Sequence, residues 1–110
     1  SEKVSYLYQP FNPALLRKIK KVIDASHVEG KWTAICGEVA GEPMLTAVLL
    51  GMGLDEFSMS ASSVLEIRRL ISKINKSEAE ELVVKVLDAE TQNEVKEIIS
   101  SWYKEKGIEI

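Results

Sequence analysis

Apolar residues recur along the first third of the chain with the spacing of a helix that buries one face. Asn12 followed by Pro13 favours a helix start, because Asn can cap orphan amides and Pro fits the first helical position. Gly30 is the expected stop. We therefore predict a one-faced amphipathic helix between these residues. Its apolar stripe consists of Leu15, Leu16, Ile19, Val22 and Ile23.

Two short apolar segments are typical of strands. Residues 32–36 lie between glycines and are partly β-branched, which suits a strand buried on both faces. Residues 56–60 form the second candidate, and a helix that opens at Pro43 and ends near Gly51 or Gly53 separates the two. A strand, a helix and a strand at this spacing predict a parallel unit with a right-handed crossover.

Three more helices are expected after the second strand. The first covers about residues 63–74, and capping boxes at Ser77 with Glu80 and at Thr91 with Glu94 open the other two. The predicted order is therefore α-β-α-β-α-α-α. The apolar positions of these helices are Val64, Leu65, Ile67, Leu70, Ile71 and Ile74, then Leu82, Val83, Val86 and Leu87, then Val95, Ile98, Ile99 and Trp102.

Length and charge narrow the class of protein. A chain of 110 residues is one domain at most. The net charge of −3 disfavours nucleic-acid binding, which relies on clustered cations. The longest nearly apolar stretch, residues 44–54, is too short to span a bilayer, and no targeting segment is visible. Cytosolic residence is the expectation, with no membrane partner.

Two strands alone do not make an ordinary parallel sheet, because such sheets have more strands and are covered on both faces. We therefore expect the remaining strands to come from missing sequence or from other copies of the chain. The chain begins with Ser1 and not with methionine, so we expect that it was processed or that it begins inside a longer product.

Cys36 is the first candidate for chemistry, since it ends the first predicted strand and the active face of α/β folds lies at that end. A thiol there can act as nucleophile or proton donor, although a buried core cysteine is the simpler interpretation. As the single cysteine, it excludes an intrachain disulfide and any metal site with two or more cysteines. His27 is expected near the opposite end of the unit, and Asp55 and Glu56 also lie away from the active face.

Other patterns have simpler interpretations. Residues 51–53 lack the spacing of a phosphate loop and are interpreted as a helix stop. The basic run 17–21 is interpreted as a solvated helix face. A serine cluster near the end of the second strand is suited to an anion at a helix N-terminus, but such serines more often cap the helix. Its members are Ser58, Ser60, Ser62 and Ser63.

Three blocks of the sequence are distinctive: HVEGKWT at 27–33, CGE-x-AG at 36–41 and LLGMGLDEFSMS at 49–60. They closely resemble the C-terminal part of the Enzyme I family, the phosphoenolpyruvate–protein phosphotransferases of the bacterial sugar phosphotransferase system. Residues 4–10 also fit. The resemblance covers nearly the whole chain and is weakest over the last two helices.

The resemblance implies that residues 1–110 are the C-terminal part of the PEP-binding domain. The fold would be α/β, a partial TIM (β/α)8 barrel with its last two β/α units plus C-terminal helices. In this family, the phosphoryl group of phosphoenolpyruvate passes to a histidine and on to a histidine phosphocarrier protein, releasing pyruvate. Cys36 would be the catalytic proton donor to the enolate, and Gly37 and Glu38 would shape the substrate loop.

Departures from the family pattern are equally informative. The Asn-Asp…Arg substrate loop, the substrate-binding arginines, the ligands of the family's Mg²⁺ and the domain with the phosphoacceptor histidine are absent from this sequence. Ser26-His27 falls in the barrel segment and should not be phosphorylated, and Glu42 stands where the family usually has Asp. We therefore expect the isolated chain to be inactive, and to reach the phosphocarrier only through the missing domain.

Two alternatives stay open. The chain could be a non-catalytic assembly module that self-associates, since the family's C-terminal domain dimerises and a two-stranded sheet leaves exposed edges. It could also be a small thiol enzyme or redox protein, but that interpretation rests on Cys36 alone and lacks a resolving cysteine and a nearby base.

Overall fold

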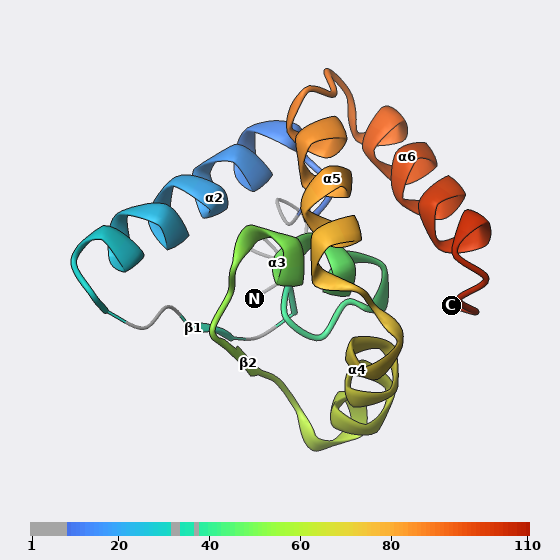
Figure 1. Cartoon of the computed structure of the whole chain (residues 1–110), viewed down its shortest axis with the longest axis horizontal. Helices are drawn as coiled ribbons and strands as arrows, with labels where there is room; N and C mark the ends of the chain where they lie inside the picture. Colours follow the sequence, from blue (N-terminus) through green and yellow to red (C-terminus); the bar gives the residue numbers. More distant parts are fainter. Residues whose placement is uncertain (1–8, 32–33, 37) are drawn as a thin grey trace.

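The computed structural model describes residues 9–31, 34–36 and 38–110, and within these ranges the chain is a mostly helical α/β unit (Figure 1). The predicted order of elements is confirmed, except that the helix predicted to open at Pro43 consists of a 3-10 turn followed directly by an α-helix. The elements are α2 (Pro13–Val28), β1 (Ala34–Cys36), η1 (Pro43–Leu45), α3 (Thr46–Met52), β2 (Glu56–Ser58), α4 (Ala61–Lys73), α5 (Lys76–Leu87) and α6 (Gln92–Glu105).

The two strands pair in parallel, which confirms the predicted strand–helix–strand unit. Each strand spans three residues, so the second is shorter than the predicted 56–60. The structure does not describe residues 32 and 33 of the first predicted strand. For residues 34–36 it describes the backbone only. The register joins Ala34 to Glu56, Ile35 to Phe57 and Cys36 to Ser58.

The first helix begins where the sequence predicted. The Oδ1 atom of Asn12 accepts a hydrogen bond from the backbone N–H of Ala14 at 2.8 Å, and Gly30 follows the helix end with a φ of 71°. Leu16 and Ile23 are fully buried, but Val22 is 54% exposed. The assignment of Val22 to the buried face of the helix is therefore wrong, because the buried stripe of α2 is narrower than the apolar stripe of the sequence.

Helix α4 begins at Ala61, two residues earlier than predicted. Its buried residues are Ile67 and Leu70, whereas Leu65 is 78% exposed. The assignment of Leu65 to the apolar stripe was therefore wrong. As in α2, a sequence stripe that spans more than one face overstates what the helix buries.

The capping boxes had different outcomes. Helix α5 is capped by Asn75 and not by Ser77, since the Asn75 side chain accepts a hydrogen bond from the Glu78 N–H at 3.0 Å. Asn is as good a cap as Ser, and the earlier start lets the helix include two more residues. At α6 the cap is confirmed, because the Thr91 hydroxyl accepts from the Glu94 N–H at 3.1 Å.

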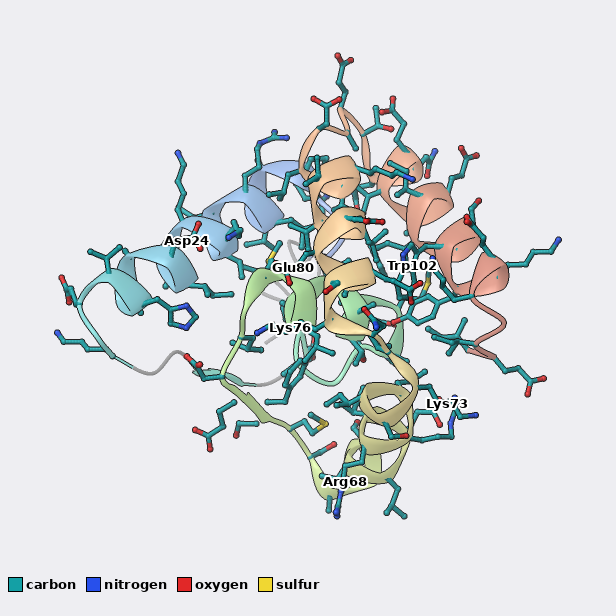
Figure 2. The ribbon with its side chains drawn as sticks, viewed as in Figure 1. Asp24, Arg68, Lys73, Lys76, Glu80 and Trp102 are labelled. Atoms are coloured by element: carbon teal, nitrogen blue, oxygen red, sulfur yellow. The ribbon has the colours of Figure 1, made fainter. Side chains whose placement is uncertain are left out.

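The core forms where α5 crosses α3, with α6 packed beside α5 (Figure 1). A Cβ atom added to Gly51 of α3 would lie 2.4 Å from the Ala79 carbonyl oxygen of α5, so the two backbones approach too closely for any larger residue. Trp102 is buried and lies between α6 and α5, while Lys76 and Glu80 are exposed on α5 (Figure 2).

Charged side chains tie the outer helices together. The Arg17 guanidinium of α2 donates to the carbonyls of Leu87 and Ala89 at 3.1 and 3.3 Å. This member of the basic run is therefore bound to the end of α5 and is not only a solvent-exposed cation. The Arg69 guanidinium contacts the Glu66 carboxylate at 2.6 Å and also donates to the Glu109 carbonyl at 2.9 Å, which holds the C-terminal tail on α4. None of the helices described is both long and apolar enough to cross a bilayer.

Candidate functional site

A hollow of about 360 Å³ lies at the ends of the two strands from which the next helices depart. The loop after β1 forms one wall, and the segment from the end of β2 into the start of α4 forms the other. This position agrees with the expectation that the active face of an α/β unit lies at the carboxyl ends of its strands. Its lining residues are Glu38, Gly41, Glu42, Met59, Ser60 and Ser63.

Cys36 is the last residue of β1, and its register partner is Ser58, the last residue of β2. Because the strands are parallel, the loops that follow both residues leave the sheet at the same edge. Glu38 lines the hollow two residues after Cys36, whereas Gly37 lies outside the described residues. The backbone therefore brings the segment around Cys36 and the serine segment to the same edge of the sheet.

The serines at the start of α4 do not cap the helix with their side chains. Ser60 is the N-cap residue, but its hydroxyl makes no capping bond and instead lies 3.1 Å from the Ser62 hydroxyl and 3.4 Å from that of Ser63. Two of these serines, Ser60 and Ser63, line the hollow. The first turn of α4 also carries the partial positive charge of a helix N-terminus, which favours anions.

Glu42 ends the loop after β1 and fixes the next element. Its Oε1 atom accepts a hydrogen bond from the Met44 N–H at 3.3 Å, so the glutamate caps η1. The backbone N–H of Leu45 also donates to the Glu42 carbonyl at 3.0 Å. Glutamate at this position therefore serves as the helix cap.

Tyr103 of α6 also reaches this loop, although sequence reasoning did not single it out. The side chain is 1% exposed, and its hydroxyl accepts from the Ala47 N–H at 3.1 Å and donates to the Pro43 carbonyl at 3.2 Å. Burial raises the pKa of Tyr103 to about 12. The available signal was a tyrosine on the apolar stripe of α6, since a buried phenol usually has a hydrogen-bond partner.

His27 lies away from the hollow, as expected. Its Nε2 atom is 2.8 Å from Oδ2 of Asp55, just before β2 begins. This pair therefore sits at the opposite end of the strand from Ser58. Nowhere in the described ranges do three or more His, Cys, Asp or Glu side chains gather in a way that could hold a metal ion.

Comparison with known proteins places the chain in a family. The family model described as "PEP-utilising enzyme, PEP-binding domain" matches residues 1–76. A "Phosphoenolpyruvate-protein phosphotransferase" of Staphylococcus aureus is 55% identical over 104 residues, 94% of this chain. The protein of the same name from Listeria monocytogenes is 53% identical over 105 residues, 96% of this chain.

The chain spans only 18% of the length of these curated relatives and matches their C-terminal part. The identity extends across α5 and α6, beyond the residues that the family model covers. Both comparisons agree with the resemblance found in the sequence blocks. This chain therefore belongs to the family of PEP-utilising enzymes, in the PEP-binding domain, and is similar to the C-terminal part of Enzyme I.

Proposed function

We propose that this chain supplies the proton donor of a phosphoenolpyruvate–protein phosphotransferase. The observation that carries the proposal is the parallel register that ends β1 at Cys36, at the sheet edge where Glu38 and the α4 serines line one hollow. The relatives that bear the name of this activity add support, at 55% identity over nearly the whole chain.

Cys36 would protonate the enolate that remains when phosphoenolpyruvate loses its phosphoryl group. An ordinary thiol has a pKa of about 8.5, so it is protonated near neutral pH. The thiol S–H bond breaks, the proton forms a C–H bond at the enolate carbon, and the products are pyruvate and a thiolate that solvent reprotonates. Glu38 and Gly37 would shape the loop that holds the substrate.

The remaining machinery is expected outside this sequence. The phosphoryl group would pass to a histidine in a separate domain and on to a histidine phosphocarrier protein. The reaction would use Mg²⁺, but the described residues offer no metal-binding cluster, so no step through the ion is assigned to them. The parent protein would act in the cytoplasm, and this chain alone would be inactive.

The same proposal accounts for the small sheet. Residues 1–110 would form the end of a (β/α)8 barrel, with β1 and β2 as its last two strands. Glu56 and Ser58 of β2 are exposed and Phe57 is half-buried, whereas parallel strands are usually covered on both faces. The rest of the barrel would cover the exposed faces, and its neighbouring strands would pair with the free edges.

A chimera tests the proton-donor role. This chain replaces the stretch that it matches in the S. aureus relative, and pyruvate release from phosphoenolpyruvate with Mg²⁺ is measured for the chimera and its Cys36→Ala form. We expect Cys36→Ala to lower the rate of pyruvate release by about 10² to 10⁴, the usual contribution of a general acid. Lys18→Ala, a change of an exposed residue on α2, is the matched control and should leave the rate unchanged.

Two outcomes would contradict the proposal. An unchanged rate in Cys36→Ala would remove the proton-donor role. Stable phosphorylation of His27 in the isolated chain, after incubation with labelled phosphoenolpyruvate and Mg²⁺, would refute its assignment as a histidine that takes no part in phosphotransfer.

Self-association is a second candidate function, favoured by the large apolar side chains left exposed in the described ranges. Leu65 of α4 is 78% exposed and Val84 of α5 is 71% exposed. Light scattering on the purified chain tests this candidate. A monomer that unfolds cooperatively would exclude it, because such a chain needs no partner strands.

A further inference from the structure

We propose that Tyr103 is a positioning residue for the loop between β1 and η1, which forms one wall of the hollow. This inference deepens the proposed function and rests on it, because the loop follows Cys36. The residue belongs to α6, beyond the stretch that the family model covers, and no resemblance noted in the sequence assigned it a role.

Both hydrogen bonds of the Tyr103 hydroxyl end on backbone groups at the end of that loop. The hydroxyl donates to the carbonyl of Pro43 and accepts from the N–H of Ala47, across 60 and 56 residues of sequence. Glu42, which lines the hollow, immediately precedes Pro43. One phenolic oxygen thus joins α6 to the point where the loop becomes helical.

The N–H of Ala47 donates to this hydroxyl near the start of α3. The first N–H groups of a helix have no acceptor within the helix. The backbone N–H of Thr46 donates to the Pro43 carbonyl. The backbone N–H of Ala47 donates to the Tyr103 hydroxyl. Ala47 is fully buried, so water cannot replace the hydroxyl without a rearrangement.

The phenol ring also contacts the ring of its neighbour in the sequence. Trp102 packs edge-on against Tyr103, with ring centroids 5.3 Å apart and planes at 85°. A phenylalanine would keep this ring packing but lose both hydrogen bonds. The contribution of the hydroxyl can therefore be separated from that of the ring.

Amide hydrogen exchange measured by NMR on the whole chain tests the contact. In the wild type, the Ala47 amide should be protected by its hydrogen bond to the Tyr103 hydroxyl. An unprotected Ala47 amide would overturn the inference without any substitution. Tyr103→Phe should speed exchange of Ala47 and of the loop amides at 38–42 by about tenfold relative to the α5 amides, because Ala47 loses its bond to the hydroxyl and Pro43 loses the bond that holds the end of the loop.

The matched control is Ile99→Val, which removes a methyl group from the buried face of α6 and keeps the Tyr103 hydroxyl. It should not speed exchange at Ala47 selectively. Equal acceleration of all amides in Tyr103→Phe would overturn the inference, because it would show a general loss of stability and no local release of the loop.

The chimera described above separates this inference from the proposed function. Tyr103→Phe should lower kcat for pyruvate release by about tenfold or more with little change in KM, since a displaced loop misplaces the reacting groups. Full kcat in Tyr103→Phe together with a loss in Cys36→Ala would overturn the positioning role alone. Full kcat in Cys36→Ala would overturn both.

Discussion

The imidazole of His27 and the carboxylate of Asp55 join the end of α2 to the start of β2, with 2.8 Å between Nε2 and Oδ2. The histidine ring also lies over Gly53, where an added Cβ would come within 3.2 Å of the His27 Cε1 atom. Gly53 has a φ of 92°, a conformation that glycine adopts without strain. The pair thus fixes one end of β2, while the hollow lies at the other.

The first prediction concerns the strength of this pair. A double-mutant cycle of His27→Ala and Asp55→Ala, followed by urea unfolding, should give a coupling free energy of about 0.2–1 kcal/mol, because both side chains are partly exposed. The pair of Lys20 and Asp24 on α2 serves as the control and should give about 0.3–0.5 kcal/mol. Additive single effects at His27 and Asp55 would show that the contact contributes nothing to stability.

The second prediction concerns the crossing of α3 and α5. Gly51→Ala should lower the free energy of unfolding by about 3 kcal/mol, because the new methyl group meets the backbone of Ala79. Gly30→Ala is the control: it has a positive φ of 71° but no atom within 4 Å, so only about 1 kcal/mol of backbone strain is expected. Urea unfolding of both variants checks the order, and an equal loss would contradict the close approach.

The sequence predicted most of the elements because caps and periodicity are local. Asn12 and Thr91 cap the helices that they were expected to cap. Stripe width was less reliable, and Val22 and Leu65 are exposed although the stripes included them. The neighbouring helix determines which edge of an apolar stripe is buried. The local sequence pattern contains no information about the position of that neighbour.

The candidate site was predictable in part for the same reason. Ending a strand at Cys36 follows from a short apolar run before glycine, and parallel pairing then places the serine segment beside it. The role of Tyr103 was not predictable, because its partners Pro43 and Ala47 are more than fifty residues away in sequence. The resemblance to Enzyme I, and not the spacing of residues, supplied the chemistry of the thiol.

The third prediction concerns Arg17 as a cap for the C-terminal end of α5. Its guanidinium donates to the Leu87 and Ala89 carbonyls, and a cation is favoured at a helix C-terminus. Arg17→Ala should therefore lower the free energy of unfolding by about 1 kcal/mol. Lys18→Ala, a change of an exposed cation on the same helix, should change it by less than about 0.5 kcal/mol. Equal effects in urea unfolding would mean that the Arg17 contacts do not stabilise α5.

The last prediction concerns alkaline pH. Burial raises the pKa of Tyr103 from 10.0 to about 12, so the folded chain holds this proton more tightly than the unfolded chain. The contribution of the protonated Tyr103 hydroxyl to the free energy of unfolding is fully present below pH 10. It is lost as the pH rises through about 12. Two pKa units correspond to about 3 kcal/mol.

Urea unfolding across this pH range measures the loss. Tyr103→Phe should be less stable at neutral pH, since it leaves the Ala47 N–H without its partner, but should lack the tyrosine part of the alkaline decline. The difference between the two slopes isolates Tyr103 from the lysines that titrate in the same range. Parallel curves would show that the phenol titrates as it does in water, and the hydroxyl would then not be enclosed between α6 and the loop that leads from Cys36.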